Sequence, residues 1–159
     1  MKPHRVTTFN PAETQAIGEQ LAVLCQGGEI ICLSGDLGAG KTTFVKGIAR
    51  GLKIDEKKVN SPTFVIMNLY EEGRLPLYHF DFYRLEKQEE IGGVGYDEFL
   101  YGNGVAVIEW SERFGALMPP ENLGVYLGHA GEQSRSLKIT PHGERYKKIV
   151  HDLKIPAKS

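Results

Sequence analysis

Two short segments of the chain are apolar at every position, Ile30-Ile31-Cys32-Leu33 and Val105-Ala106-Val107-Ile108. A strand that carries apolar side chains on both faces is typical of a sheet covered on both sides, as in parallel α/β folds. The first segment is followed by a glycine-rich loop and then by a helical stretch over 42–52. The pattern therefore predicts a strand–loop–helix unit, with the second apolar segment as a neighbouring strand of the same buried sheet.

The rest of the pattern predicts helices and antiparallel strands around this unit. Asn10-Pro11 and Glu13 are typical of a helix start, and Gly27-Gly28 of its end. β-Branched and aromatic residues predict a hairpin from 59–70 and 75–82, in which Pro62 and Pro76 mark edge or irregular positions. The remaining expected elements are short helices within 84–104, two antiparallel strands at 123–129 and 136–140, and a terminal helix at 144–153.

The glycine-rich loop carries the strongest chemical signal in the chain. Its sequence, Gly35-Asp36-Leu37-Gly38-Ala39-Gly40-Lys41-Thr42, matches the phosphate-loop pattern at every fixed position. Because such a loop leaves a buried strand and enters a helix, its backbone N–H groups and the positive end of the helix dipole point into one concavity. Lys41 would reach the β- and γ-phosphates of a nucleotide, and the Thr42 hydroxyl would ligate magnesium. A plain glycine turn explains neither residue.

This loop and the apolar strands predict an α/β fold of the P-loop NTPase-like, three-layer type. We expect a mostly parallel central sheet, with a β-hairpin or antiparallel strands at its edges, in one domain over residues 1–159. The absence of Asn-Lys-x-Asp and Asp-x-x-Gly from the chain removes the elements usual in GTPases and favours ATP over GTP.

Two acidic residues are candidates for the catalytic groups beside the phosphates. Glu109 ends the apolar segment 105–108, where a carboxylate next to a core is costly unless it has a task, such as holding magnesium. The alternative is a solvated acid at a strand end. Asp81 follows Leu77-Tyr78-His79-Phe80, and it would hold the metal through water, orient the attacking water, or only cap a turn. His79 by itself is typical of a structural histidine.

Two further features near the predicted site have less specific sequences. Ser61 and Thr63 lie about twenty residues after the phosphate loop, where many NTPases place a segment that senses the γ-phosphate. Ser-Pro-Thr is also ordinary turn chemistry. Trp110, the only tryptophan, would lie beside the nucleotide, face a partner, or simply be packed.

Composition and charge limit the remaining function classes. Of the 159 residues, 41% are hydrophobic and 25% charged, as in an average globular domain, and the formal net charge is −1. The segment 135–159 nevertheless has seven basic and two acidic residues, a net +5, which is either a solvated helix face or a surface for RNA or a partner. With no candidate membrane span and no signal-peptide pattern, we expect a cytoplasmic protein without membrane contact, whose Cys25 and Cys32 are buried, inert thiols.

Four motifs together resemble the bacterial TsaE (YjeE) family of ATPases. They are the phosphate loop extended by Thr43-Phe44, then Ser61-Pro62-Thr63-Phe64, His79-Phe80-Asp81-Phe82-Tyr83-Arg84-Leu85 and Glu109-Trp110. They occur in the family's order and spacing, and the similarity runs from about Thr14 to Leu137. The resemblance implies a small magnesium-dependent ATPase needed to make threonylcarbamoyladenosine in tRNA. Such a protein joins the TsaB and TsaD proteins and supports their turnover without transferring the threonylcarbamoyl group itself.

The resemblance also implies roles for individual residues. Gly38, Ala39, Gly40, Lys41, Thr42 and Thr43 would contact the phosphates of ATP. Thr42 and Glu109 would hold Mg²⁺, with Lys41, Asp81 and Glu109 as the catalytic residues. Ser61 and Thr63 would belong to a switch-like loop. Arg135 matches a family arginine near the nucleotide, and Arg84 is the only motif-linked candidate for an arginine finger.

Two other functions remain open from the residues alone. A small-molecule kinase would also bind ATP, although the scarcity of arginines between Arg74 and Arg135 disfavours the arginine-rich lid of such enzymes. A non-hydrolytic, ATP-gated binding module would use the nucleotide only to order residues 61–64. The sequence leaves direct contact with tRNA open, and any contact is expected to be indirect or weak.

Overall fold

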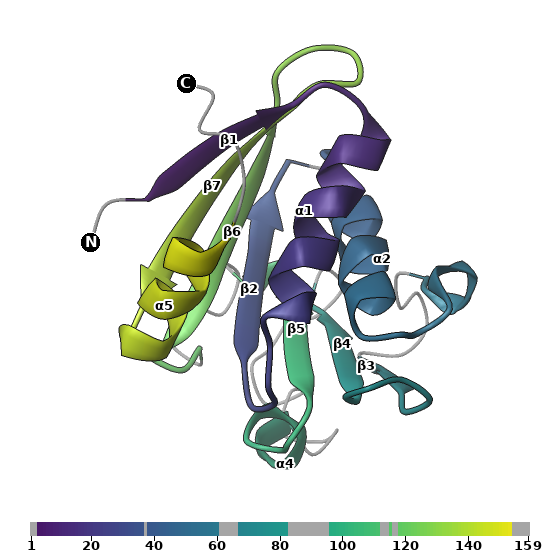
Figure 1. The fold of residues 1–159 in the computed structure, drawn as a ribbon, viewed down its shortest axis with the longest axis vertical. Helices are drawn as coiled ribbons and strands as arrows, with labels where there is room; N and C mark the ends of the chain where they lie inside the picture. Colours follow the sequence, from purple (N-terminus) through teal and green to yellow (C-terminus); the bar gives the residue numbers. More distant parts are fainter. Residues whose placement is uncertain are drawn as a thin grey trace.

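The computed structural model describes residues 3–36, 38–60, 67–82, 96–111, 115 and 118–153, and is built on one mixed β-sheet (Figure 1). The seven strands lie in the order β1-β7-β6-β2-β5-β4-β3. Their bounds are β1 His4–Thr8, β2 Ile30–Gly35, β3 Met67–Tyr70, β4 Leu77–Asp81, β5 Val105–Glu109, β6 Asn122–His129 and β7 Arg135–His142. The helices are α1 Pro11–Val23, α2 Lys41–Gly51, α4 Tyr96–Leu100 and α5 Glu144–Asp152, with a 3-10 turn η1 at Glu56–Lys58.

The centre of the sheet is parallel and its edges are antiparallel. Strand β2 pairs in parallel with β5 on one side and β6 on the other, and β5 pairs in parallel with β4. The two apolar segments are thus neighbours, with Ile30 opposite Ala106 and Leu33 opposite Glu109. Strand β3 is antiparallel to β4, β7 to β6, and β1 to β7. The predicted α/β fold and the two late antiparallel strands are confirmed. The hairpin is confirmed as β3 and β4, whereas residues 61–66 of its predicted first strand lie outside the described residues.

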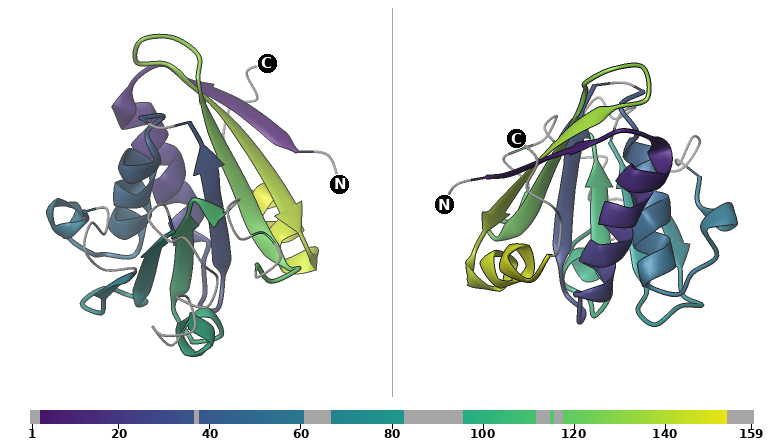
Figure 2. Two further views of the ribbon diagram at one scale, coloured as in Figure 1. Left: turned by 180° about the vertical axis from the view of Figure 1, so that it is seen from behind. Right: turned by 45° about the horizontal axis from the view of Figure 1, so that its top comes forward.

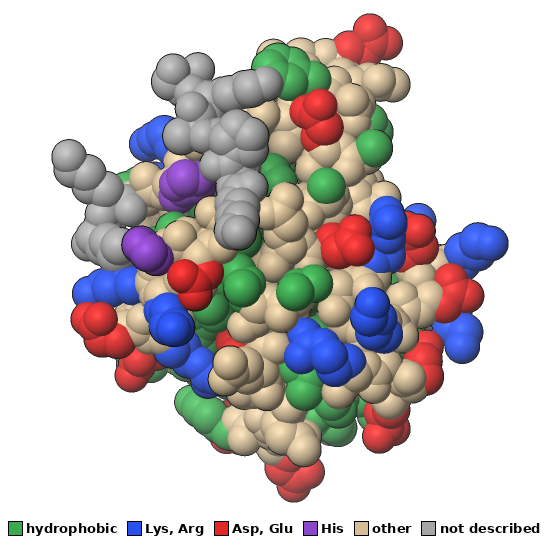
Figure 3. All heavy atoms as spheres, viewed as in Figure 1, with side chains coloured by type: hydrophobic (Ala, Val, Ile, Leu, Met, Phe, Trp, Pro, Cys, Tyr) green, Lys and Arg blue, Asp and Glu red, His purple; other side chains and the backbone are tan. Residues whose placement is uncertain are grey.

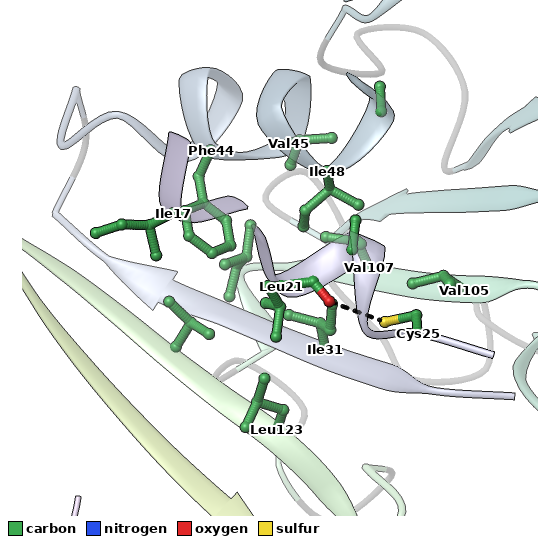
Figure 4. Close-up of a cluster of buried hydrophobic side chains, with 14 of the residues drawn as sticks. Ile17, Leu21, Cys25, Ile31, Phe44, Val45, Ile48, Val105, Val107 and Leu123 are labelled. Atoms are coloured by element: carbon green, nitrogen blue, oxygen red, sulfur yellow. Dashed lines mark hydrogen bonds between the residues drawn. The ribbon is translucent and has the colours of Figure 1, made fainter. Parts of the chain in front are cut away.

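Helices α1 and α2 lie side by side over one face of β2 and β5 (Figure 1). Their backbones approach closely because glycines stand at the crossing: a β-carbon on Gly47 would overlap the Gln15 carbonyl, and one on Gly18 would lie 2.5 Å from the Phe44 carbonyl oxygen. Ile17 and Leu21 of α1 meet Phe44 and Ile48 of α2 above the strands (Figure 4). This contact sets the position of α2, and therefore of the loop that precedes it.

The opposite face of the sheet is covered over part of its width. Tyr96 and Leu100 of α4 pack against Phe80 and its neighbours on β2, β4 and β5. The rings of Phe80 and Tyr96 meet edge to face, with centroids 5.3 Å apart, and burial raises the pKa of Tyr96. No described helix covers the same face over β1, β7 and β6, as Figure 2 shows from behind.

The elements near the two ends of the chain confirm some predictions and correct others. Asn10 caps α1 by accepting a hydrogen bond from the Glu13 N–H at 2.9 Å, as its sequence indicates. The helix ends at Val23, before the end that Gly27-Gly28 predicts, so Cys25 lies outside it. Strand β1 was not predicted, because Val6 and Thr8 are the only buried positions of a five-residue strand. The terminal helix is confirmed as α5, and 154–159 lie outside the described residues.

Both cysteines are free and buried, as predicted. The Cys25 thiol bonds the Leu21 carbonyl oxygen at 3.6 Å (Figure 4). Burial raises the pKa of each thiol to about 12, because an apolar surrounding disfavours the thiolate. Of the helices in the described part of the chain, none has the length and apolar character that a membrane span requires.

Candidate nucleotide-binding site

The phosphate loop joins the carboxyl end of β2 to the first turn of α2, as predicted from the motif. Gly38 and Gly40 have φ values of 76° and 94°, in the left-handed region that favours glycine. Apart from the two chain neighbours, a β-carbon on Gly38 would meet no atom of a described residue within 4 Å, so the backbone there faces open space among the described residues. Ala39, between them, is buried, and its N–H donates to the Asp36 carbonyl at 3.1 Å. The loop is therefore a shaped backbone turn open on one side.

Lys41 turns its side chain back into this loop. Its ammonium nitrogen donates to the carbonyl oxygens of Gly35 at 2.9 Å and Asp36 at 3.1 Å, and the residue is only 6% exposed. The same nitrogen lies 3.8 Å from the centroid of the Trp110 ring, in cation–π geometry. A positive charge is thus held inside the loop by oxygen dipoles and a ring face, which is how a phosphate-binding lysine would be positioned.

Thr42 and Thr43 occupy the first turn of α2 behind Lys41. The N-cap residue, Gly40, has no side chain that could accept hydrogen bonds from this turn, and the helix carries no acid there. The positive end of the helix dipole is therefore not offset by an acid of its own first turn. This positive end of the helix dipole would stabilise an anion bound in the loop.

Glu109 ends β5, next to the end of β2, and is 2% exposed. Its carboxylate oxygen Oε2 accepts a hydrogen bond from Nε2 of His79, which lies fully buried on the neighbouring strand β4. The other ring nitrogen of His79, Nδ1, has no hydrogen-bond partner among the described residues. The structure thus does not support the solvated acid, because Glu109 and His79 form one buried pair. His79 is a buried structural histidine, as its sequence indicates, and its hydrogen bond orients the Glu109 carboxylate.

Asp81 lies at the end of β4 and pairs in register with Glu109 across β4 and β5. Directly paired residues of neighbouring strands point to the same face of a sheet, so both acids face the side on which α2 lies. Asp81 is half-buried, while Glu109 is buried. The sheet therefore brings the predicted acids to one edge, with Glu109 on the strand next to the loop and Asp81 one strand further away.

Oxygen ligands of this kind suit Mg²⁺. Magnesium typically takes one or two protein carboxylates or hydroxyls and completes its shell with water and phosphate oxygens. The described residues contain no cluster of three or more His, Cys, Asp or Glu of the kind that would make an all-protein metal cage. A Thr42 hydroxyl and a Glu109 carboxylate oxygen match the magnesium pattern.

Arg135, at the start of β7, closes the loop from the other side. Its Nε donates to the Ala39 carbonyl at 3.1 Å, and one terminal nitrogen is 3.4 Å from the Gly38 carbonyl oxygen. The other terminal nitrogen donates to the Ser134 carbonyl at 2.8 Å. One guanidinium thus ties the β6–β7 hairpin to the backbone of the phosphate loop.

Comparison with known proteins shows to which family the chain belongs. The family described as "Threonylcarbamoyl adenosine biosynthesis protein TsaE" matches residues 8–137. The chain belongs to the TsaE family. It is 43% identical to the tRNA threonylcarbamoyladenosine biosynthesis protein TsaE of Bacillus subtilis, covering 96% of this chain and 95% of that protein.

Other relatives and a solved structure agree with the TsaE assignment. The TsaE protein of Nostoc sp. is 44% identical over 80% of each chain, and that of Treponema pallidum is 38% identical over 85% of this chain and 98% of its own. The crystal structure of Bacillus subtilis YdiB superimposes with a TM-score of 0.81 at 38% identity, covering 96% of this chain and 94% of that one. The phosphate loop, Glu109 and Asp81 all lie within the matched TsaE region.

Some residues expected from the TsaE resemblance lie outside the described residues, namely Ser61, Thr63 and Arg84. Others have contacts that sequence reasoning missed. The pairing of His79 with Glu109 depends on β4 lying beside β5, which only the strand order reveals. Trp110 has a left-handed φ of 61°, unusual for a bulky residue, and its ring both packs on the apolar cluster and faces Lys41. In the sequence, the Glu109-Trp110 motif was the feature from which the contact of Trp110 with Lys41 could have been expected.

Proposed function

We propose that the chain is a magnesium-dependent ATPase required for threonylcarbamoyladenosine modification of tRNA. It acts with TsaB and TsaD family proteins in the cytoplasm, where their tRNA substrate resides, and supports repeated turnover of their complex. The observation that carries the ATPase assignment is the buried Lys41 ammonium, held inside a phosphate loop at the carboxyl ends of parallel strands. Ligands bind at this edge in open α/β sheets.

The phosphates of ATP would lie in the concavity of the loop. Backbone N–H groups of residues 38–43 and the N-terminus of α2 would bind their oxygens, and Lys41 would exchange its carbonyl contacts for the β- and γ-phosphates. Arg135 would maintain the loop shape through the Gly38 and Ala39 carbonyls. These groups stabilise negative charge on the transferring phosphoryl group.

Thr42 and Glu109 would hold the magnesium ion, with His79 fixing the carboxylate. When bound, the metal supplies positive charge to the phosphate oxygens. We assign Asp81 to orienting the attacking water, because it stands one strand further from the loop than Glu109 and is more exposed. The relatives' shared name, tRNA threonylcarbamoyladenosine biosynthesis protein, supports the modification pathway as the place of this activity.

The direct test is turnover of γ-labelled ATP by the chain together with TsaB and TsaD from the same organism. We expect the label in inorganic phosphate. Asp81→Asn should keep ATP affinity within a few-fold and lose about 100-fold or more in rate, as for removal of a general base. Asp97→Asn, an exposed acid on α4, is the matched control and should turn over normally.

Three outcomes would contradict parts of this proposal. Label in an organic acceptor would indicate a kinase. Wild-type turnover by Asp81→Asn would remove the role of Asp81. Normal tRNA modification by a variant that binds ATP without hydrolysing it would favour the gated binding module.

A further inference from the structure

The face of the sheet formed by β1, β7, β6 and β2, turned away from α5, is not covered by any described helix (Figure 2). It forms a shallow cavity of about 790 Å³ lined by residues of all four strands. Its neighbour on the same face, over β5 and β4, is covered by α4 through Tyr96 and Leu100. The open part is thus a distinct surface, separate from the nucleotide site on the other face.

Glycines on β6 make this surface hollow. Gly124 and Gly128 flank Tyr126 on the open face, so the middle of the sheet has little side-chain cover there. The Tyr126 ring lies 3.3 Å from the position of a β-carbon on Gly128, and His142 Nε2 lies 3.8 Å from that of Gly124. Glycine within a strand weakens it and often marks close approach of a ligand. The Tyr126 and His142 rings therefore lie low over the sheet, which is the floor of this surface, with Tyr126 covering the buried Gly128 and with Gly124 half-buried.

The side chains around this floor carry positive charge. Arg5 and Lys138 are exposed cations, and no acidic residue is among the described residues that line the cavity. Tyr126 is opposite Lys138 on β7, which is opposite Arg5 on β1. Neighbouring strands are about 4.8 Å apart, so one ring and two cations form a row across the sheet. The α1, α2 and α5 side, in contrast, intersperses basic and acidic side chains (Figure 3).

Hydroxyl groups complete the lining. Thr7, Ser34, Ser136 and Thr140 all contribute to the cavity wall. They can donate to phosphate oxygens and either donate to or accept from sugar hydroxyls. Tyr126, 42% exposed, presents a large apolar ring at the centre of this polar surface. A ring among cations and hydroxyls on an open sheet is the arrangement on which single-stranded nucleic acids stack.

We propose that this face binds a single-stranded segment of RNA. Arg5 and Lys138 contact successive phosphates, a base stacks on Tyr126, and the hydroxyls contact the sugar. The choice of RNA rests on the proposed function in tRNA modification, whereas the charge and the exposed ring themselves require a polyanion with planar groups. A duplex fits poorly, because the face is a shallow hollow in the sheet from which no described helix protrudes to enter a groove. An acidic protein segment would use the cations but leave the ring and the glycine floor without a role.

The small number of cations sets the expected strength. Two permanently charged side chains give a logarithmic salt dependence of the association constant with a slope of about −1.4 for a single strand. Stacking on one ring contributes a further factor of about 5 to 150 in affinity. The predicted binding is therefore weak, salt-sensitive and dependent on Tyr126.

The test is fluorescence anisotropy of a labelled anticodon stem-loop RNA, titrated with the full chain without nucleotide, so that the result does not depend on ATP hydrolysis. We expect Tyr126→Ala to weaken binding about tenfold, Tyr126→Phe to bind as the wild type, and Lys138→Gln to lower the salt slope by about 0.7. Gly124→Val should also weaken binding by filling the floor without changing the charge. Lys148→Gln, an exposed lysine on α5, is the matched control and should bind normally. Thermal unfolding checks that each variant is folded.

Specific results would overturn the proposal. The first is equal RNA affinity of the wild type, Tyr126→Ala and Lys138→Gln. The second is an affinity for a fully double-stranded RNA equal to that for the stem-loop. The third is complete displacement of the RNA by polyglutamate, which would identify an acidic protein as the occupant. Because ATP turnover is measured separately, loss of the RNA proposal would leave the ATPase proposal standing, and the reverse also holds.

Discussion

Strand β7 presents basic residues to two different environments. Arg135 shares the covered face with Leu137 and Ile139, and its guanidinium bonds the carbonyls of the phosphate loop. Lys138 points to the open face and lines the cavity there. Alternation along a strand separates two residues of like charge, three positions apart, onto opposite sides of the sheet.

The difference shows that the net +5 of residues 135–159 is not one surface. Besides Arg135 and Lys138, Arg145 on α5 donates to the buried carboxylate of Glu29 at 3.2 Å. Lys147 pairs with Glu144 on the same helix. Part of the charge thus bonds the protein's own loops and acids and part lies on the open face, whereas Lys154 and Lys158 lie outside the described residues. Charge in a sequence segment therefore has to be assigned residue by residue before a binding surface is inferred.

Among the predictions, glycine substitutions should give the largest difference between the covered and the open face, measured as the free energy of unfolding. Gly47→Ala would push a β-carbon into the Gln15 carbonyl and force α1 and α2 apart, whereas Gly124→Ala on the open face meets its nearest atom, the Thr140 carbonyl oxygen, at 3.6 Å. We expect a loss of about 2 kcal/mol in the free energy of unfolding for Gly47→Ala, and a change within about 0.5 kcal/mol for Gly124→Ala. Urea unfolding measures both. Equal stability of the two variants would show that the covered face is not closely packed.

A smaller effect is expected from the arginine on the covered face. Arg135→Ala removes the hydrogen bonds that tie the hairpin to the phosphate loop, and should weaken ATP binding about tenfold. Arg135→Lys should not restore the affinity, because an ammonium lacks the planar fork that reaches two carbonyls. Titration calorimetry with Lys148→Ala as the control checks this. Unchanged ATP affinity in Arg135→Ala would show that the hydrogen bonds of Arg135 to the phosphate loop do not contribute to ATP binding.

The smallest expected effect is the reactivity of the cysteines, one in the core of each face. With burial raising the pKa of each thiol to about 12, only about one thiol in ten thousand is ionised at pH 8. Since the thiolate is the reactive form, iodoacetamide should not modify the native protein at pH 8 and should modify both residues in urea. Rapid modification of one thiol in the native state would show that its face opens.

The central fold could be predicted because its signals are local. An apolar strand, a phosphate loop and a helix follow one another in 30–52, and the hairpin and late strands have alternating or β-branched sequences around turn residues. Strand β1 lacked such a signal, and it is held by pairing with β7, more than 120 residues away. Long-range pairing of this kind leaves little trace in a short segment.

The positions of the candidate site residues could be predicted where a motif names them, and contacts were missed where only the folded geometry joins two residues. Lys41, Asp81 and Glu109 lie at one edge of the sheet as the motifs indicate. The buried bond between His79 and Glu109 depends on strand order, and the open face depends on which helices cover which strands. Neither property is encoded in residue spacing.

The most direct test of the central claim is calorimetric titration of Mg-ATP into the wild type, Lys41→Ala and the matched control Lys46→Ala, five residues further along α2. The proposed site predicts saturable binding to the wild type and Lys46→Ala, and at least about a hundredfold weaker binding to Lys41→Ala, since a buried charge contact to phosphate is lost. Equal affinity of Lys41→Ala and the wild type, or no binding of Mg-ATP to the wild type, would contradict the assignment of this loop as the nucleotide site.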